Sequence, residues 1–115
     1  MLTRLYKRIL EKLQLTPEEL FKLQERLTKQ NICKGPFLQG EKMCPNTTAL
    51  AIKGGDGNSL NAQEVKMLLK KHGVTAYDLC SFYLLFDLPS MFSDKLFEKS
   101  LGRLKEAVDE LLNKR

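Results

Sequence analysis

The sequence predicts an all-α fold, a small single-domain helical bundle of about five helices with a long irregular segment at residues 31–60. Apolar residues recur every three or four positions through most of the chain, and strong N-capping residues precede these stretches. Glycine and proline gather in the irregular segment. With 115 residues, 43% of them hydrophobic, the chain can bury one core. We therefore expect one domain over residues 1–115, with a helical hairpin in 1–30 and further helices in 61–115.

The most apolar stretch is Leu79–Leu88, in which only Ser81 and Asp87 are polar. Thr75 precedes it as an N-cap with an acidic residue three positions later, and the apolar positions fit the i, i+3, i+4, i+7 spacing of a helix. A stretch that is apolar on all sides leaves no face for water. We therefore predict a fully buried central helix that Pro89 ends.

Residues 1–30 predict two helices joined by a short turn. One face of the first helix carries the apolar residues Leu2, Leu5, Ile9 and Leu13. Another face carries a basic stripe, formed by Arg4, Lys7, Arg8 and Lys12. Thr16 and Pro17 then supply an N-cap and a proline at the first helical position, which ends the first helix and begins the second. We expect the two helices to form an antiparallel hairpin.

Residues 31–60 contain glycines and prolines but little sustained periodicity. Within them, residues 45–53 begin with proline and are followed by glycine, a pattern that favours a short helix over a strand. Further along, Asn61 is expected to begin a helix that Gly73 ends. Ser93 is expected to begin a final helix with a continuous apolar stripe.

The net charge is +5, and the excess of lysine and arginine lies in residues 1–42. A moderate basic excess permits contact with an acidic partner or nucleic acid, but it mainly favours solubility. No apolar run approaches the roughly 20 residues that span a bilayer, and the N-terminus carries no export signal. We therefore expect a cytoplasmic protein with no membrane partner and with reduced cysteines.

Two known helix–loop–helix classes fit parts of the sequence. A DNA-reading helix–turn–helix would combine residues 65–72 with 75–86, but the second helix begins with alanine, tyrosine and aspartate instead of side chains that read DNA. An EF-hand pair would use residues 53–64 and 87–98, but both loops lack oxygen ligands at required positions. A calcium-independent EF-hand-like module is kept as a second alternative for the function.

Zinc is the one metal that the residue types suggest, since thiolates and imidazole are ligands that zinc prefers. The candidates are Cys33, Cys44, His72 and Cys80. They include no Cys-x-x-Cys pair and match no common zinc-finger spacing. Isolated buried thiols and a histidine at a helix end are the simpler interpretation. We expect no cofactor, and we expect no enzyme activity because no catalytic motif stands out.

These observations favour a small regulatory or adaptor protein that recognises another protein. The alternative is sequence-independent binding of nucleic acid by the basic stripe. Irregular segments on a rigid scaffold are where recognition groups project, so the expected binding surface joins the irregular segment to the exposed face of the first helix. Its predicted members are Arg4, Lys7, Arg8, Lys12, Lys34, Phe37, Leu38, Lys42 and Met43.

Overall fold

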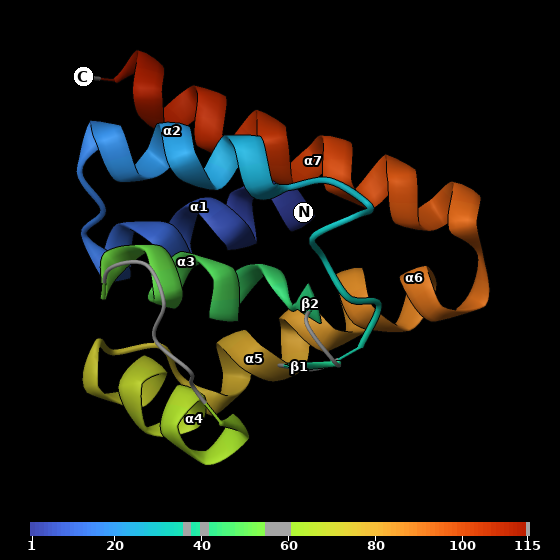
Figure 1. Ribbon diagram of the computed structural model, residues 1–115, viewed down its shortest axis with the longest axis horizontal. Coiled ribbons are helices and arrows are strands. Elements are labelled where there is room, and N and C mark those ends of the chain that lie inside the picture. Colours follow the sequence, from blue (N-terminus) through green and yellow to red (C-terminus); the bar gives the residue numbers. More distant parts are fainter. Residues whose placement is uncertain (36–37, 40–41, 55–60, 115) are drawn as a thin grey trace.

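The computed structural model describes residues 1–35, 38–39, 42–54 and 61–114 (Figure 1), and it confirms the all-α class. Its helices are α1 (Leu2–Leu13), α2 (Pro17–Arg26), α3 (Pro45–Lys53), α4 (Ala62–Lys71), α5 (Ala76–Phe82), the π-helical turn η1 (Tyr83–Asp87), α6 (Leu88–Phe92) and α7 (Asp94–Asn113). A small antiparallel pair of strands joins β1 (Leu38–Gln39) to β2 (Lys42–Met43).

The helices pack in layers around one apolar core. In Figure 1, α7 and α2 lie along one side, α1 and α3 lie in the middle, and α5, η1 and α6 form a continuous rod along the other side. α1 packs mainly on α7, whereas α3 contacts α1, α2 and α4. α3 is the most enclosed element, because every residue from Pro45 to Ile52 is buried.

Aromatic rings connect the layers at the centre of the core. The Phe82 ring lies 5.7 Å from the Tyr6 ring and 5.2 Å from the Phe86 ring, measured between centroids. Phe86 in turn meets Phe97 of α7 at 6.1 Å, edge to face. Phe82 and Phe86 are buried, which confirms that this side of the rod belongs to the core.

The predicted helix starts are confirmed by their caps. Thr16 and Thr75 each form a capping box, in which the threonine hydroxyl and the acidic side chain at N3 satisfy backbone N–H groups at the helix start. The side chains of Asn61 and Ser93 accept hydrogen bonds at the starts of α4 and α7. Gly73 follows α4 with φ +86°, a conformation that glycine adopts without steric cost.

The two helices predicted for residues 1–30 are present and joined by a short turn, and their main packing partners are other elements. α1 and α2 run in opposite directions (Figure 1). α1 packs chiefly on α7, and α2 packs on α3 and α7. The apolar stripes of both helices are therefore covered by elements from later in the chain, which the local pattern of residues 1–30 cannot reveal.

Residues 45–53 form a helix, as the sequence favoured. Cys44 caps α3, since its Sγ accepts the Thr47 N–H at 3.4 Å. The hydroxyl of Tyr6 donates to the Pro45 carbonyl oxygen at 3.1 Å and so ties α1 to the start of α3. The irregular segment is thus interrupted by a buried helix.

Pro89 does not end the central helix, so that prediction is wrong. The rod continues through η1 into α6, where the Leu88 N–H donates to the Tyr83 carbonyl in a π-type hydrogen bond. A proline inside an α-helix lacks a donor and clashes with the carbonyl one turn earlier. The wider π turn just before Pro89 relieves both problems, and the rod ends only at Phe92.

The helical course of residues 87–98 also excludes a second EF-hand loop there. η1, α6 and α7 leave only Ser93 between helices in that range. Part of the first candidate loop, residues 55–60, lies outside the described residues. Within the described part of the chain, no helix is both long and apolar enough to cross a bilayer.

Candidate functional site

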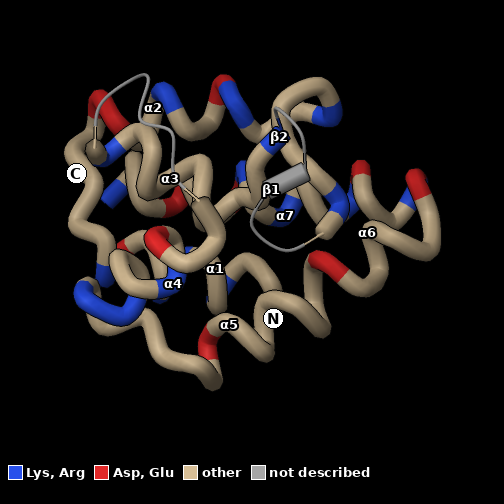
Figure 2. Tube along the Cα trace, turned by 60° about the horizontal axis from the view of Figure 1, so that its bottom comes forward, with Lys and Arg blue, Asp and Glu red and all other residues tan. Residues whose placement is uncertain are grey.

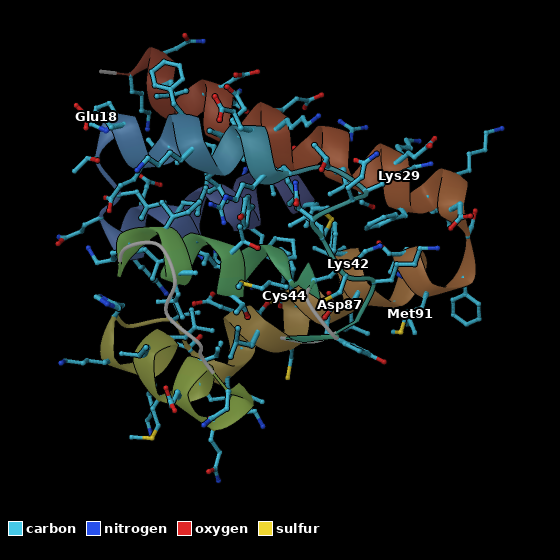
Figure 3. All side chains as sticks on the ribbon, in the orientation of Figure 1. Glu18, Lys29, Lys42, Cys44, Asp87 and Met91 are labelled. Carbon is cyan, nitrogen blue, oxygen red and sulfur yellow. The ribbon has the colours of Figure 1, made fainter. Side chains whose placement is uncertain are left out.

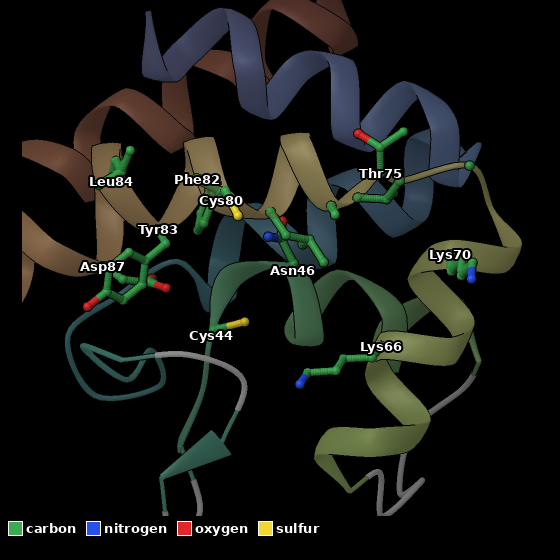
Figure 4. Close-up of a pocket in the computed structure, with 14 residues that line it drawn as sticks. Cys44, Asn46, Lys66, Lys70, Thr75, Cys80, Phe82, Tyr83, Leu84 and Asp87 are labelled. Atoms are coloured by element: carbon green, nitrogen blue, oxygen red, sulfur yellow. The ribbon is translucent and has the colours of Figure 1, made fainter.

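A groove opens between α4 and the rod, with the start of α3 at its floor (Figure 4). We call it the α4–rod groove. Its volume is about 960 Å³, and most of its lining surface is apolar. Sites that bind other molecules are typically of this kind, mainly apolar with a few placed polar groups. The lining residues are Cys44, Asn46, Lys66, Lys70, Gly73, Val74, Thr75, Ala76, Leu79, Cys80, Phe82, Tyr83, Leu84 and Asp87.

The rod has two apolar faces, and only one of them faces the core. Tyr83 and Leu84 line the groove with 37% and 60% of their surfaces exposed. Cys80 beside them is exposed as well. The prediction that this stretch is buried on all sides is therefore wrong. The core covers only some of the apolar side chains of this stretch. Others, such as Tyr83 and Leu84, face the open groove.

Two buried polar side chains line the same groove. Asn46 of α3 is 2% exposed and Asp87 of η1 is 5% exposed. The Oδ1 atoms of both side chains have no hydrogen-bond partner among the described residues. In Figure 4, Asp87 lies beside Tyr83 at one end of the groove, whereas Asn46 lies nearer its middle. An unsatisfied buried polar group costs about 1–3 kcal/mol, so a hydrogen-bond donor in the groove would gain from pairing with these acceptors.

Burial also changes the proton affinity of Asp87. Because water is largely excluded, the pKa of this carboxyl rises to about 7. A donor or cation beside the carboxylate would stabilise the charged form and lower this pKa again. The groove thus contains an acid that titrates near neutral pH and whose Oδ1 accepts no hydrogen bond from the described residues.

The π turn accounts for the position of Asp87. An extra residue in that turn changes the angular positions of the side chains that follow, and both Asp87 and Ser90 are buried. Ser90 Oγ is likewise without a hydrogen-bond partner among the described residues. Single π turns inside α-helices are frequent at functional sites, which agrees with the placement of η1 at the groove.

Cys44, at the start of α3, and Asp87, on η1, line the same groove (Figure 3). Burial raises the pKa of the Cys44 thiol to about 11, and hydrogen bonds with Thr47 offset this only in part. Burial likewise raises the pKa of Cys33, whose thiol donates a hydrogen bond to the Gly35 carbonyl oxygen. Both thiols are therefore protonated at neutral pH and are poor nucleophiles.

The zinc candidates do not form a metal site. Cys33 and Cys44 are buried, whereas Cys80 is exposed and His72 is the C-cap residue of α4. Across the described ranges, no three cysteine, histidine, aspartate or glutamate side chains are grouped so that they could hold a metal ion. The geometry thus gives the zinc alternative no support.

Most of the basic stripe is engaged within the protein. Arg8 Nη2 lies 3.0 Å from Asp78 Oδ1, and Lys12 Nζ lies 2.6 Å from Asp78 Oδ2. Lys7 pairs with Glu110 of α7 at 3.4 Å, whereas Arg4 is exposed. Figure 2 shows lysine and arginine spread over several helices and interleaved with acidic residues. These pairs fasten α1 to the rod and to α7.

Tyr6 is also not placed for stacking on a nucleic-acid base. It is on the same helix as the basic stripe, but its side chain is completely buried and its hydroxyl donates to the Pro45 carbonyl oxygen. Burial and the nearby Cys44 raise its pKa well above the ordinary value for tyrosine. Tyr6 is a core residue of the α1–α3 contact.

The other predicted binding residues lie away from the α4–rod groove. Lys34 forms an ion pair with Asp94 and sits 5.5 Å from the Phe97 ring centroid. Lys42 is exposed, and together with Lys34 it lines a smaller cavity of about 300 Å³. Met43 is half-buried and pairs with Leu38 across the small strands. The sequence also predicted Phe37, which lies outside the described residues.

Comparison of the chain with protein-family models, with curated proteins and with solved structures found no match in any of the three. The class is therefore defined by the structure alone: an all-α domain whose central rod presents a second apolar face in a groove. Sequence analysis missed this groove. The signal was present in the excess of apolar residues in Leu79–Leu88 and in the aspartate among them.

Proposed function

We propose that this chain is a small, non-catalytic regulatory or adaptor protein that binds another protein in the α4–rod groove. The observation that carries the proposal is the combination of exposed apolar side chains and unpartnered buried acceptors in one groove. A partner segment would cover Tyr83 and Leu84 and would supply donors to Asn46 and Asp87. This keeps the kind of partner that the sequence favoured but moves the binding surface to the rod.

The free energy expected from covering the apolar side chains of the groove supports recognition at this site. Fully burying an exposed large apolar side chain contributes about 1.5–3 kcal/mol. Tyr83 and Leu84 are 37% and 60% exposed, so covering each of them contributes a part of that amount to association. Contiguous apolar surface of this kind on a small protein is a common mark of an interaction site. The buried acceptors add specificity, because a partner without donors would leave them unpaired.

The chemistry of the groove favours binding over catalysis. Cys44 is protonated at neutral pH because its pKa is about 11. His72 is not among the residues that line the groove. The groove thus pairs Asp87 with apolar walls and a protonated thiol, a combination suited to holding a partner rather than to activating a nucleophile.

The alternative of nucleic-acid binding through the basic stripe is less favoured. Arg8 and Lys12 share Asp78, and Lys7 already faces Glu110. Binding phosphates would compete with these carboxylates. The two functions separate by salt, since phosphate binding weakens steeply with ionic strength whereas an apolar protein interface does not.

The proposal is tested by affinity capture with matched variants. Leu84→Glu places a charge in the groove, and Phe92→Glu places the same charge on a side chain that is 80% exposed, at the C-terminal end of the rod and not among the groove residues. Both positions are exposed, so both variants should melt close to wild type. Proteins that bind wild type and Phe92→Glu but not Leu84→Glu are the expected partners. A candidate would then be purified and titrated against all three forms by calorimetry.

Equal binding of purified partners by Leu84→Glu and wild type would overturn the assignment of the groove. Loss of all binding in high salt for every form would favour the nucleic-acid alternative. A lowered melting temperature for Leu84→Glu alone would show that Leu84 has a packing role, and Tyr83→Ser would then replace it as the groove variant.

A further inference from the structure

We infer that the partner of the α4–rod groove is an amphipathic helix of another protein that places a lysine or arginine against Asp87. This inference rests on the proposed function, because it specifies the occupant of the same groove. It is carried by the buried acceptors, by the helical walls and by the length of the groove.

The buried acceptors define the polar chemistry of the occupant. Asp87 Oδ1 and Asn46 Oδ1 both accept, and neither has a partner among the described residues. An occupant must therefore donate, and beside a carboxylate a cationic donor gains more than a neutral one. An acidic or purely apolar segment would leave the ionised form of Asp87 unpaired, so it could cover the site only with Asp87 protonated.

The walls define the backbone of the occupant. α3, α4, α5 and η1 surround the groove, and helices satisfy their own backbone hydrogen bonds. None of the described residues that line the groove belongs to a strand, so an extended segment there would bury unpaired N–H and C=O groups. A helix carries its backbone bonds internally and presents apolar side chains at i, i+3, i+4 and i+7.

The length of the groove agrees with a helix. Its lining runs along the rod from Thr75 to Asp87, which corresponds to roughly 17 Å, or about three helical turns. Lys70 of α4 lines the groove away from Asp87 (Figure 4). We therefore expect an acidic residue on the occupant toward Lys70, with the basic residue at the Asp87 end. These opposite charges fix the direction in which the helix lies.

The test begins with a phage-displayed library of random 16-residue peptides on a helix-favouring background, selected against the wild-type protein and counter-selected against Leu84→Glu. The expected sequences carry helical apolar spacing and a basic residue at one end. The tightest peptide is then synthesised in two forms, one with its lysine or arginine and one with norleucine at that position.

Both peptides are titrated against wild type and Asp87→Asn. The basic peptide should bind wild type about tenfold or more tightly than the norleucine peptide. The two should bind Asp87→Asn with similar affinity, because the carboxylate is gone. Phe92→Glu serves as the matched control and should behave as wild type. Melting curves of each variant show that the fold is kept.

The outcomes separate this inference from the proposed function. Two results would overturn the inference and leave groove recognition standing. One is the selection of peptides that require Leu84 but have no preference for a basic residue. The other is that replacing the basic residue with norleucine weakens binding to wild type and to Asp87→Asn equally. Peptides that bind equally to Leu84→Glu would overturn both. Failure to select any peptide, together with binding of octylamine that Asp87→Asn abolishes, would replace the helix with a small amphiphilic amine. Failure to select any peptide and to bind octylamine would also count against both.

Discussion

Asp78 and Asp87 lie on the same helical rod and are both nearly inaccessible to water, but their surroundings are opposite. Asp78 is 2% exposed and Asp87 is 5% exposed. Asp78 accepts hydrogen bonds from Arg8, from Lys12 and from the Thr75 N–H. Asp87 Oδ1 accepts none from the described residues. The Asp78 carboxylate is thus paired with cations within the protein, whereas Asp87 Oδ1 has no hydrogen-bond partner among the described residues.

The two carboxyls titrate on opposite sides of their ordinary value as a result. For Asp78, burial raises the pKa, but the hydrogen bonds from Lys12, Thr75 and Arg8 outweigh burial and lower it to about 2. For Asp87, burial acts alone and raises the pKa to about 7. The difference teaches that burial does not decide the role of a charge. Asp78 fastens α1 to the rod. Asp87 Oδ1 accepts no hydrogen bond from the described residues, and our proposal is that a partner supplies one.

The largest effect on the free energy of unfolding is expected on the side of the rod that faces the core. Phe86 is completely buried and contacts the rings of Phe82 and Phe97. Phe86→Ala should lower the free energy of unfolding by about 3–5 kcal/mol, measured by chemical denaturation. A loss below about 1 kcal/mol would mean that the rod is not held by this face.

The next largest effect concerns Asp87 and depends on pH. An acid with a raised pKa in the folded state stabilises the protein at low pH, and this stability is lost as pH rises through the folded pKa of about 7. Relative to Asp87→Asn, wild type should therefore lose up to about 3 kcal/mol of stability between pH 5 and pH 8.

The groups whose charge couples to Asp87 do not interfere with this measurement. Burial raises the pKa values of both Cys33 and Cys44, and the charge of Asp87 adds to this, so these thiols stay protonated over that range. Denaturation of wild type and Asp87→Asn at several pH values gives the difference. A constant difference would contradict the burial of an unpaired carboxyl.

A smaller effect of opposite sign is expected at Asp78. Its lowered pKa means that stability is present above the ordinary value of the carboxyl and is lost as pH falls toward about 2. Asp78→Asn should cost about 2 kcal/mol at pH 7 because it removes the charge that holds Arg8 and Lys12. Glu110→Gln, which breaks the exposed pair with Lys7, is the control and should change little.

The smallest effects are expected on the groove face. Leu84→Glu and Phe92→Glu replace exposed side chains and should each shift the free energy of unfolding by no more than about 0.5 kcal/mol. Thermal melts of both variants check this. A large loss at Leu84 alone would mean that the groove is closed by the chain itself.

The sequence predicted the helical class and the helix starts because these depend on local chemistry. Thr16 and Thr75 satisfy backbone groups within their own first turn, so their patterns are readable without the fold. The packing of α1 and α2 on α7 was not predictable in this way. It depends on apolar stripes that come together only in the folded chain.

The candidate site was missed for a related reason. Apolar periodicity shows which side chains avoid water but not whether the chain itself or a partner covers them. The prediction that Pro89 ends the central helix was wrong because a π turn changes the local helical geometry. Asp87, which lies in that turn, is buried. The basic stripe was predicted as a binding surface, yet Arg8 and Lys12 form ion pairs with Asp78, which is distant in the sequence.

The most direct test is an NMR titration that follows the side-chain carboxyl carbons of Asp78 and Asp87 in the free protein. The account predicts a pKa of about 2 for Asp78 and about 7 for Asp87. The resonances are assigned with Asp78→Asn and Asp87→Asn. If Asp87 instead titrates near the ordinary value of about 4, its carboxyl is solvated or already paired. The claim that one end of the rod awaits a cationic partner would then be contradicted.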